Sequence, residues 1–213
     1  SALTIAPDGD IAIHPKGLMA VEHYLIVRSL MYRGVYNHRI NEVCNWILEK
    51  LIKTIRLLGS EKIWADEIMA EWLWNAREMS LYTFLENDDI RTNYHIARWL
   101  KESPKEVKRL CERFLNRKLL KAENISHLSN EKKLELLAKA RVLSSKYSID
   151  PDFSCGLRNH NHSGYEPYKS GLRLWDGKQL QALEKCSSLI RSLIKPSDLS
   201  WLIYPREIDT EVQ

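Results

Sequence analysis

Residues 40–58 follow the period of an α-helix more regularly than any other part of the chain. Apolar residues recur there at i, i+3, i+4, i+7 and i+8, and the series continues to i+15, so they lie on one side of a helix. Gly59 follows directly and is a typical helix terminator. The pattern predicts an amphipathic helix whose stripe lies in the core or at a subunit interface. The stripe is Ile40, Val43, Cys44, Ile47, Leu48, Leu51, Ile52 and Ile55.

Further helices are predicted on both sides of this one. A helical pattern covers 18–35 after Gly17, and residues 61–86 form a helix rich in Trp and Met, packed through its aromatic side chains. Asp88 or Asp89 caps the next helix, and Ser103 opens a capping box with Pro104 and Glu106. A last long helix covers 130–147. The apolar positions assigned to the last three helices are Ile90, Tyr94, Ala97 and Leu100; Val107, Leu110, Cys111, Phe114 and Leu115; and Leu134, Leu137, Ala138 and Val142.

Strands are predicted only near the two ends of the chain and at 118–122. Residues 1–14 read as a hairpin with a turn at Asp8-Gly9, and 171–175 and 201–205 are strand-like. A short helix near 188–194 lies between these two runs, and 150–170 reads as a loop. We therefore expect a mainly α fold. It is a helical, bundle-like region with a short N-terminal hairpin over 1–125, followed by a helix and a small α+β extension over 126–213.

Composition narrows the protein class. Charged residues make up 28% of the chain and the mean hydropathy is -0.38, which excludes a membrane-spanning or a disordered acidic protein. Residues 101–150 hold 13 Lys/Arg against 7 Asp/Glu, although the whole chain carries only +4. This basic stretch is either a solvated helix face or a contact for phosphate-bearing partners. No aromatic platform or RNA-binding motif accompanies it, so nucleic acid is not the expected partner.

The cysteines and the N-terminus indicate the compartment. Four Cys are widely spaced without a C-x-x-C motif, which is typical of free thiols in a reducing, cytoplasmic protein. The first residues lack the layout of a signal peptide. They also lack an initiator Met, which points to a start of the protein elsewhere.

The densest polar constellation lies in residues 28–39. Arg28, Tyr32 and Tyr36 are spaced four apart, so a continuous helix places them on one face, with Arg39 near it. An Arg fork suits a phosphate, and a Tyr ring can pack on a sugar or a base. A seam between helices with exposed arginines explains the same pattern.

Two other groups of residues have side chains that could form a site. Cys155, His160 and His162 include zinc-type ligands, but they lie in one loop without a fourth partner, so a polar surface loop is favoured and no metal site is predicted. The carboxylates of Glu86, Asp88 and Asp89 are explained by a helix cap, with acid–base chemistry as the alternative.

Several segments together resemble one family. The run GLMAVEHYLIVRSLMYRGVYNHR is similar to the segment after the catalytic core of HD-domain phosphohydrolases, the group that includes deoxynucleoside triphosphate triphosphohydrolases. The stretches FLENDDIRTNYHIARW and LCERFLNRKLLKAE resemble later segments of the family, and the tail from Pro167 resembles the C-terminal extension of its bacterial members. The family's His, His-Asp and Asp metal ligands lie upstream of these segments and have no counterpart here, so the chain looks like the C-terminal half of such an enzyme.

The resemblance implies roles for five residues. Arg28 would contact the substrate triphosphate and Tyr36 the deoxyribose, while Tyr32, His38 and Arg39 would lie at a pocket rim or a regulatory nucleotide site. It implies a nucleotide or other phosphoester ligand, a homo-oligomer, and a divalent transition metal or magnesium in the intact enzyme, with no cofactor held by this chain itself. A non-catalytic helical module that binds a nucleotide or a protein is the alternative.

Overall fold

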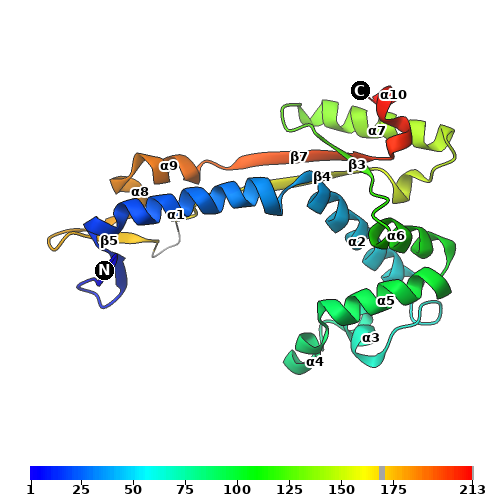
Figure 1. Cartoon of the computed structure of the whole chain (residues 1–213), viewed down its shortest axis with the longest axis horizontal. Helices are drawn as coiled ribbons and strands as arrows, with labels where there is room; N and C mark the ends of the chain where they lie inside the picture. The colour runs from blue at the N-terminus through cyan, green and yellow to red at the C-terminus, as the bar shows by residue number, and fades with distance from the viewer. Residues whose placement is uncertain (168–170, 213) are drawn as a thin grey trace. The chain divides into compact units, whose positions relative to one another are not determined.

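The computed structural model describes residues 1–167 and 171–212, without the side chains of His162 and Ser197. Its residues form two compact units (Figure 1). Unit 1 comprises residues 1–38 and 159–200, and unit 2 comprises residues 39–158 and 201–213. Each unit is therefore assembled from two segments that are far apart in the sequence. The predicted boundary after residue 125 lies inside unit 2. The described chain is mainly helical, as expected.

Unit 1 combines a small sheet with helices. The sheet has the order β1-β2-β5-β6, in which β2 and β5 are parallel and the other neighbours antiparallel. The predicted hairpin is confirmed: Leu3 pairs with Ile13, and Gly9 takes the positive φ of 87° that the turn requires. The elements are β1 (Leu3–Ile5), β2 (Ile11–Ile13), η1 (Pro15–Gly17), α1 (Leu18–Met31), η2 (Tyr32–Tyr36), β5 (Arg173–Trp175), β6 (Leu180–Ala182), α8 (Leu183–Cys186) and α9 (Ser188–Ile194).

Helix α1 packs on α9 and shares a small core with the sheet (Figure 1). Only Leu25 and Ser29 of α1 are fully buried, although most of its residues are apolar. The predicted helix over 18–35 changes character at its end, because residues 32–36 form a π-helix. The N–H of Asn37 donates to the carbonyl of Tyr32 at 2.8 Å and closes this wider turn.

Unit 2 is a set of helices around α2, completed by a three-stranded sheet of order β3-β7-β4. β3 and β7 are antiparallel, with Lys121 opposite Tyr204. Strands β4 and β7 each contribute residues to both units. The remaining elements are α2 (Arg39–Leu58), α3 (Glu67–Trp74), α4 (Leu81–Glu86), α5 (Asp89–Glu102), α6 (Lys105–Leu115), β3 (Lys121–Asn124), α7 (Asn130–Lys146), η3 (Pro151–Phe153), β4 (Gly156–His162), β7 (Ser197–Tyr204), η4 (Arg206–Ile208) and α10 (Asp209–Val212).

The predicted stripe of α2 is the centre of the unit 2 core. Val43, Ile47, Leu51 and Ile55 are at most 2% exposed and pack with residues of α3, α5, α6 and β3. Cys44, Leu48 and Ile52 are half-buried, and Ile40, in the first turn of the helix, is 49% exposed. The stripe is therefore the core of its own unit rather than an interface.

The structure corrects the prediction for 61–86. This segment forms two short helices, α3 and α4, instead of one. Met69 is fully buried, whereas Phe84 is 54% exposed, so only the first half of the segment contributes to the core. Residues 75–80 separate the helices, and Ser80 caps the second one by accepting from the N–H of Thr83 at 3.0 Å.

Three further predictions are wrong because tertiary packing selected another arrangement. Residues 156–162 of the predicted loop form strand β4, which finds a partner in β7. Ser103 ends α5, and Pro104 opens α6 without a side-chain cap. Helix α7 buries Ala140, Leu143 and Ser144, while Leu134 and Val142 are 61% and 58% exposed.

The core position of α2 yields a direct test. Leu51→Ala removes a side chain with no exposure, and we expect it to lower the free energy of unfolding by about 2–5 kcal/mol. Leu57→Ala, in the same helix but 88% exposed, should change it by less than about 0.5 kcal/mol. Urea unfolding followed by tryptophan fluorescence measures both, since six of the seven Trp belong to unit 2. Equal losses for the two variants would contradict the assigned core.

Candidate functional site

Arg28 lies on the half-buried side of α1, in unit 1. Its guanidinium donates to the Tyr32 hydroxyl at 3.4 Å and to the carbonyl of Gly164 at 3.4 Å, and it lies 4.8 Å from the centroid of the Tyr32 ring. The i, i+4 pairing of Arg28 with Tyr32 expected from the sequence is therefore present. The arrangement holds a cation and an aromatic face next to each other.

These two residues line a pocket of about 810 Å³ within unit 1. Tyr24 and Tyr165 add phenol groups to it, and burial raises the pKa of Tyr165, so that this hydroxyl stays neutral. Arg173 at the pocket edge is engaged by Asp8 at 2.6 Å and by Asp10 at 2.8 Å. Asp10 and Glu166 also line the pocket, so its charged residues are of both signs. The part that suits a phosphate next to a sugar or an aromatic ring is the Arg28 fork beside the phenol groups.

Tyr36 does not line this pocket. The π-helix shifts it off the face that a continuous α-helix would share with Arg28, and its side chain is 55% exposed. Its ring lies 5.0 Å from that of Tyr32, tilted by 49°. His38 follows as the last, exposed residue of this segment of unit 1. The structure thus joins Arg28 to Tyr32 in one pocket, and Tyr36 lies beside Tyr32 outside the lining of that pocket.

Arg39 belongs to unit 2, where it lines a different hollow. This hollow of about 240 Å³ also includes Arg117, Lys121 and Arg206. A second hollow of about 460 Å³ shares Arg117, Leu119 and Arg206 with it, so the two adjoin. We call the combined surface the basic groove. Its cations are Arg39, Arg109, Arg113, Arg117, Lys118, Lys121 and Arg206, and its acidic residues are Glu112 and Glu207.

Ion pairs compensate part of the charge of the basic groove. Lys118 pairs with Glu112 at 2.6 Å, and Lys121 pairs with Asp209 at 2.6 Å, which lowers the pKa of that carboxyl group. Burial lowers the pKa of Arg113, an effect that Glu207 opposes and the neighbouring Arg109 reinforces. An arginine remains charged at neutral pH even so. The groove thus keeps a positive excess suited to an anion.

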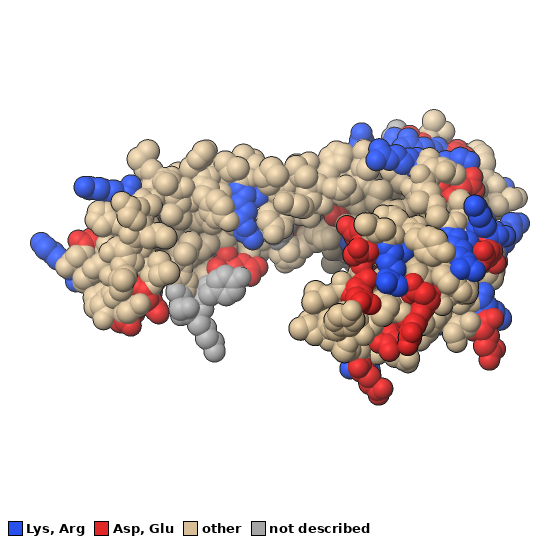
Figure 2. Space-filling view, turned by 60° about the horizontal axis from the view of Figure 1, so that its bottom comes forward, with Lys and Arg blue, Asp and Glu red and all other residues tan. Residues whose placement is uncertain are grey.

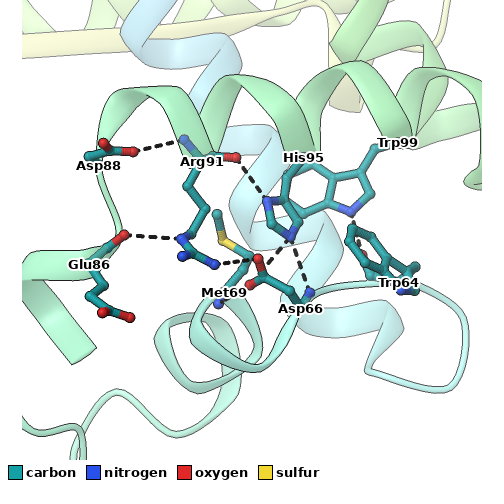
Figure 3. Close-up of polar contacts among 8 residues, drawn as sticks. All are labelled: Trp64, Asp66, Met69, Glu86, Asp88, Arg91, His95 and Trp99. Carbon is teal, nitrogen blue, oxygen red and sulfur yellow. Dashed lines mark hydrogen bonds and ion pairs between the residues drawn. The ribbon is translucent and has the colours of Figure 1, made fainter.

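Sequence reasoning missed a polar cluster around His95, which Figure 3 shows. The ring is fully buried on α5, and both of its nitrogens are engaged. Nε2 accepts from the backbone N–H of Asp66 at 3.2 Å, so Nδ1 carries the proton that is donated to the carbonyl of Arg91 at 2.9 Å. Trp64 stacks on the ring at 5.1 Å between centroids.

Asp66 connects this cluster to α3. Its carboxylate caps α3 by accepting from the N–H of Met69 at 2.8 Å, and it forms an ion pair with Arg91. Arg91 also donates to the carbonyl of Glu86 at 3.0 Å, and Asp88 caps α5, as predicted (Figure 3). The cluster is therefore a clamp that ties α3 and the end of α4 to α5. The available signal was the pair Arg91 and His95 at i, i+4, together with Trp99 one turn further.

Cys155, weighed with His160 and His162 as a zinc-type group, lies in the core of unit 2. Cys155 is buried against Ser144, with its sulfur 3.0 Å from the hydroxyl, and burial raises its pKa. Among the residues that the structure describes, no group of three or more His, Cys, Asp or Glu side chains could hold a metal ion. The side chain of His162 lies outside those residues. None of the four cysteines forms a disulfide.

Comparisons with known proteins place this geometry in context. Residues 2–146 match the family model described as "HD associated region". The chain is similar to the uncharacterised protein YwfO of Bacillus subtilis, with 23% identity over 94% of this chain and 48% of that protein. The fold is similar to that of a phosphohydrolase from Bacteroides thetaiotaomicron, with a TM-score of 0.77 and 20% identity, over 96% of this chain and 54% of the other.

A hypothetical protein from Aquifex aeolicus has a similar fold, with a TM-score of 0.65 and 20% identity, over 100% of this chain and 48% of the other. The chain thus spans about half the length of the relatives it matches. Within the described part of the chain, no helix has both the length and the apolar character needed to cross a lipid bilayer.

The clamp around His95 can be tested through stability. Asp66→Ala removes both the cap of α3 and the ion pair with Arg91, and we expect a loss of about 1–3 kcal/mol in the free energy of unfolding. Asp89→Ala, an exposed residue in the first turn of α5, should cost about 0.5 kcal/mol or less. Thermal unfolding followed by circular dichroism compares the two. A loss for Asp66→Ala no larger than for Asp89→Ala would show that the clamp contributes nothing.

Proposed function

Because the chain belongs to the family of HD associated regions, a family related to HD-domain proteins, we propose that it is the C-terminal part of a metal-dependent HD-type nucleotide phosphohydrolase of the deoxynucleoside triphosphate triphosphohydrolase type. In this proposal it supplies contacts to phosphate and sugar groups and to other subunits.

The observation that carries this proposal is the basic groove. Arg39, Arg117 and Arg206 come from three separate parts of the chain and line one surface. A guanidinium presents paired N–H donors that match two oxygens of a phosphate, so several of them on one surface suit a triphosphate better than a single negative charge. We assign the groove to a nucleotide phosphate chain, with Arg39 in the regulatory role that the sequence resemblance implies.

The pocket of Arg28 supports the same proposal at a second place. Arg28 and Tyr32 line it together, which fits a role for Arg28 in binding substrate phosphate. Tyr36 is assigned to the deoxyribose and His38 to the pocket rim on the strength of the resemblance. Both side chains are exposed, so they are accessible to a ligand.

The metal of such an enzyme does not fit the residues described here, because none of their side-chain groups forms a suitable ligand set. A divalent ion would activate water for attack on phosphorus. In this proposal its ligands come from another part of the protein. The chain's own contribution is limited to binding and orienting the nucleotide.

The outer side of α1 exposes apolar side chains, which is expected if this chain is part of a larger protein. Met19, Val27 and Leu30 are between 43% and 80% exposed on it. An apolar helix side of this extent is normally covered by protein. We propose that the remainder of the enzyme or a second subunit of a homo-oligomer covers it.

Nucleotide binding tests the proposal. We expect dGTP to bind the chain in calorimetric titration, and Arg39→Ala combined with Arg117→Ala to weaken binding about tenfold or more, because two charge-assisted contacts are lost. Lys146→Ala removes an exposed cation on α7, outside the groove, and should leave the affinity unchanged. The absence of binding, or equal weakening by the control, would contradict the assigned groove.

Catalysis needs the product of the native gene. Intact-mass measurement shows whether the mass of that product exceeds 25.0 kDa. Phosphate-release assays with the same product then test whether it hydrolyses nucleotides. Release from deoxynucleoside triphosphates supports the phosphohydrolase. Nucleotide binding without release by the native product would favour the non-catalytic binding module instead.

A further inference from the structure

Helix α4 and the start of α5 present an unusual amount of apolar surface within unit 2. The large side chains there point mostly into solvent, and we call them the α4 face. They are Leu81, Tyr82, Phe84, Leu85, Ile90 and Tyr94, with exposed fractions of 74%, 71%, 54%, 68%, 79% and 56%. Ile90 and Tyr94 of this set are predicted from the sequence to pack in the core. The core instead takes His95, Ile96 and Trp99 from the opposite side of α5.

The stability of α4 by itself is low. It has six residues and none of them is fully buried. Helices this short are marginal in water without packing on an apolar side. A partner that covered the α4 face would remove this apolar surface from water and stabilise the helix at the same time.

Charge around the α4 face is strongly negative. Residues 61–94, which include the whole α4 face, hold eight Asp and Glu against three Lys and Arg, whereas the whole chain has a net charge of +4. Figure 2 shows acidic side chains gathered on one side of unit 2, next to an uncharged area. An apolar surface with an acidic border is complementary to a segment that is both apolar and cationic.

A shallow pocket of about 430 Å³ joins these two properties. It is lined by Ile90 and Tyr94 of the α4 face, by Glu86 and Asp88, and by Asp66, which forms an ion pair with Arg91 of the same lining. Glu86 forms a hydrogen bond with Tyr82 that raises the pKa of the phenol, so the carboxylate of Glu86 lies on the α4 face itself. A Lys or Arg side chain entering the pocket would meet the carboxylates of Glu86 and Asp88 next to apolar contacts.

From this combination we infer that the α4 face is a docking surface for a basic amphipathic helix of another protein. The apolar side of that helix covers Leu81, Phe84 and Leu85, and one of its cations enters the pocket of Glu86 and Asp88. A second copy of this chain does not fit through a two-fold contact, because two acidic surfaces would face each other. The inference goes beyond the proposed function and is independent of it.

A model peptide tests the recognised chemistry. The probe is a fluorescein-labelled peptide of about 18 Leu and Lys residues, ordered so that Leu occupies one side of the helix. Fluorescence anisotropy measures its binding to the full chain. Two control peptides should bind with an affinity that is lower by about tenfold or more. One has the same composition in scrambled order, and the other has Glu in place of Lys.

Paired variants locate the binding surface. Leu81→Ser with Leu85→Ser removes apolar contact, and Glu86→Gln with Asp89→Asn removes charge; each pair should weaken binding about tenfold. Leu134→Ser with Val142→Ser, and Glu131→Gln with Glu135→Gln, make the same changes at exposed positions of α7. These controls should stay within about twofold of the unchanged chain, with equal circular dichroism spectra.

Three results would overturn the inference. One is no difference between the ordered and scrambled peptides, and another is equal weakening by the α7 controls. The third comes from sedimentation velocity: if the chain associates with itself and Leu81→Ser with Leu85→Ser abolishes that association, the α4 face belongs to a second copy. Nucleotide affinity of the same variants is expected to stay unchanged, which separates this test from that of the basic groove.

Discussion

Burial of one side of α2 is the constraint on which unit 2 depends. Ile47, Leu51 and Ile55 have no exposure, and every neighbouring element is placed by its contact with this stripe. Burial of a large aliphatic side chain is worth about 1.5–3 kcal/mol, so several in one line outweigh local preferences elsewhere. The same stripe also determines where the basic groove begins. Val43 is buried at its end, and Arg39 and Ile40, one turn earlier, reach the surface beside β3.

Unit 1 follows a different balance of burial and exposure. Its helix α1 is apolar on most sides, but a small sheet and α9 cover only one of them. The polar contacts of Arg28 lie on the covered side, where Gly164 approaches the helix closely enough that a Cβ atom would lie 2.9 Å from the Ser29 hydroxyl. The residue type at 164 is therefore dictated by the packing that forms the wall of the pocket.

The modest net charge of the chain is the sum of two oppositely charged surfaces in unit 2 and the remaining residues. The basic groove collects cations from α2, α6, the segment that leads into β3, and η4, whereas α3, α4 and the start of α5 carry an acidic excess. Opposite surfaces on one unit can recognise different partners without competing for them. The two ligands proposed above, a phosphate chain and a cationic helix, each carry the charge opposite to that of one surface.

The sequence by itself determined the elements whose signals are local. The period of 40–58, the Asp8-Gly9 turn and the Asp88 cap depend on neighbours within a few residues, and all three are present. Tertiary structure decided which apolar positions are buried, because α5 and α7 carry apolar residues on more than one side and the rest of the unit selects one. It also decided which of the candidate residues lie together. The π-helix over 32–36 separates Tyr36 from the pocket of Arg28. Arg39 lies next to Arg117 and Arg206 only because segments that are distant in the sequence pack near the start of α2. Local spacing cannot encode such convergence, since it arises from the burial of the shared core.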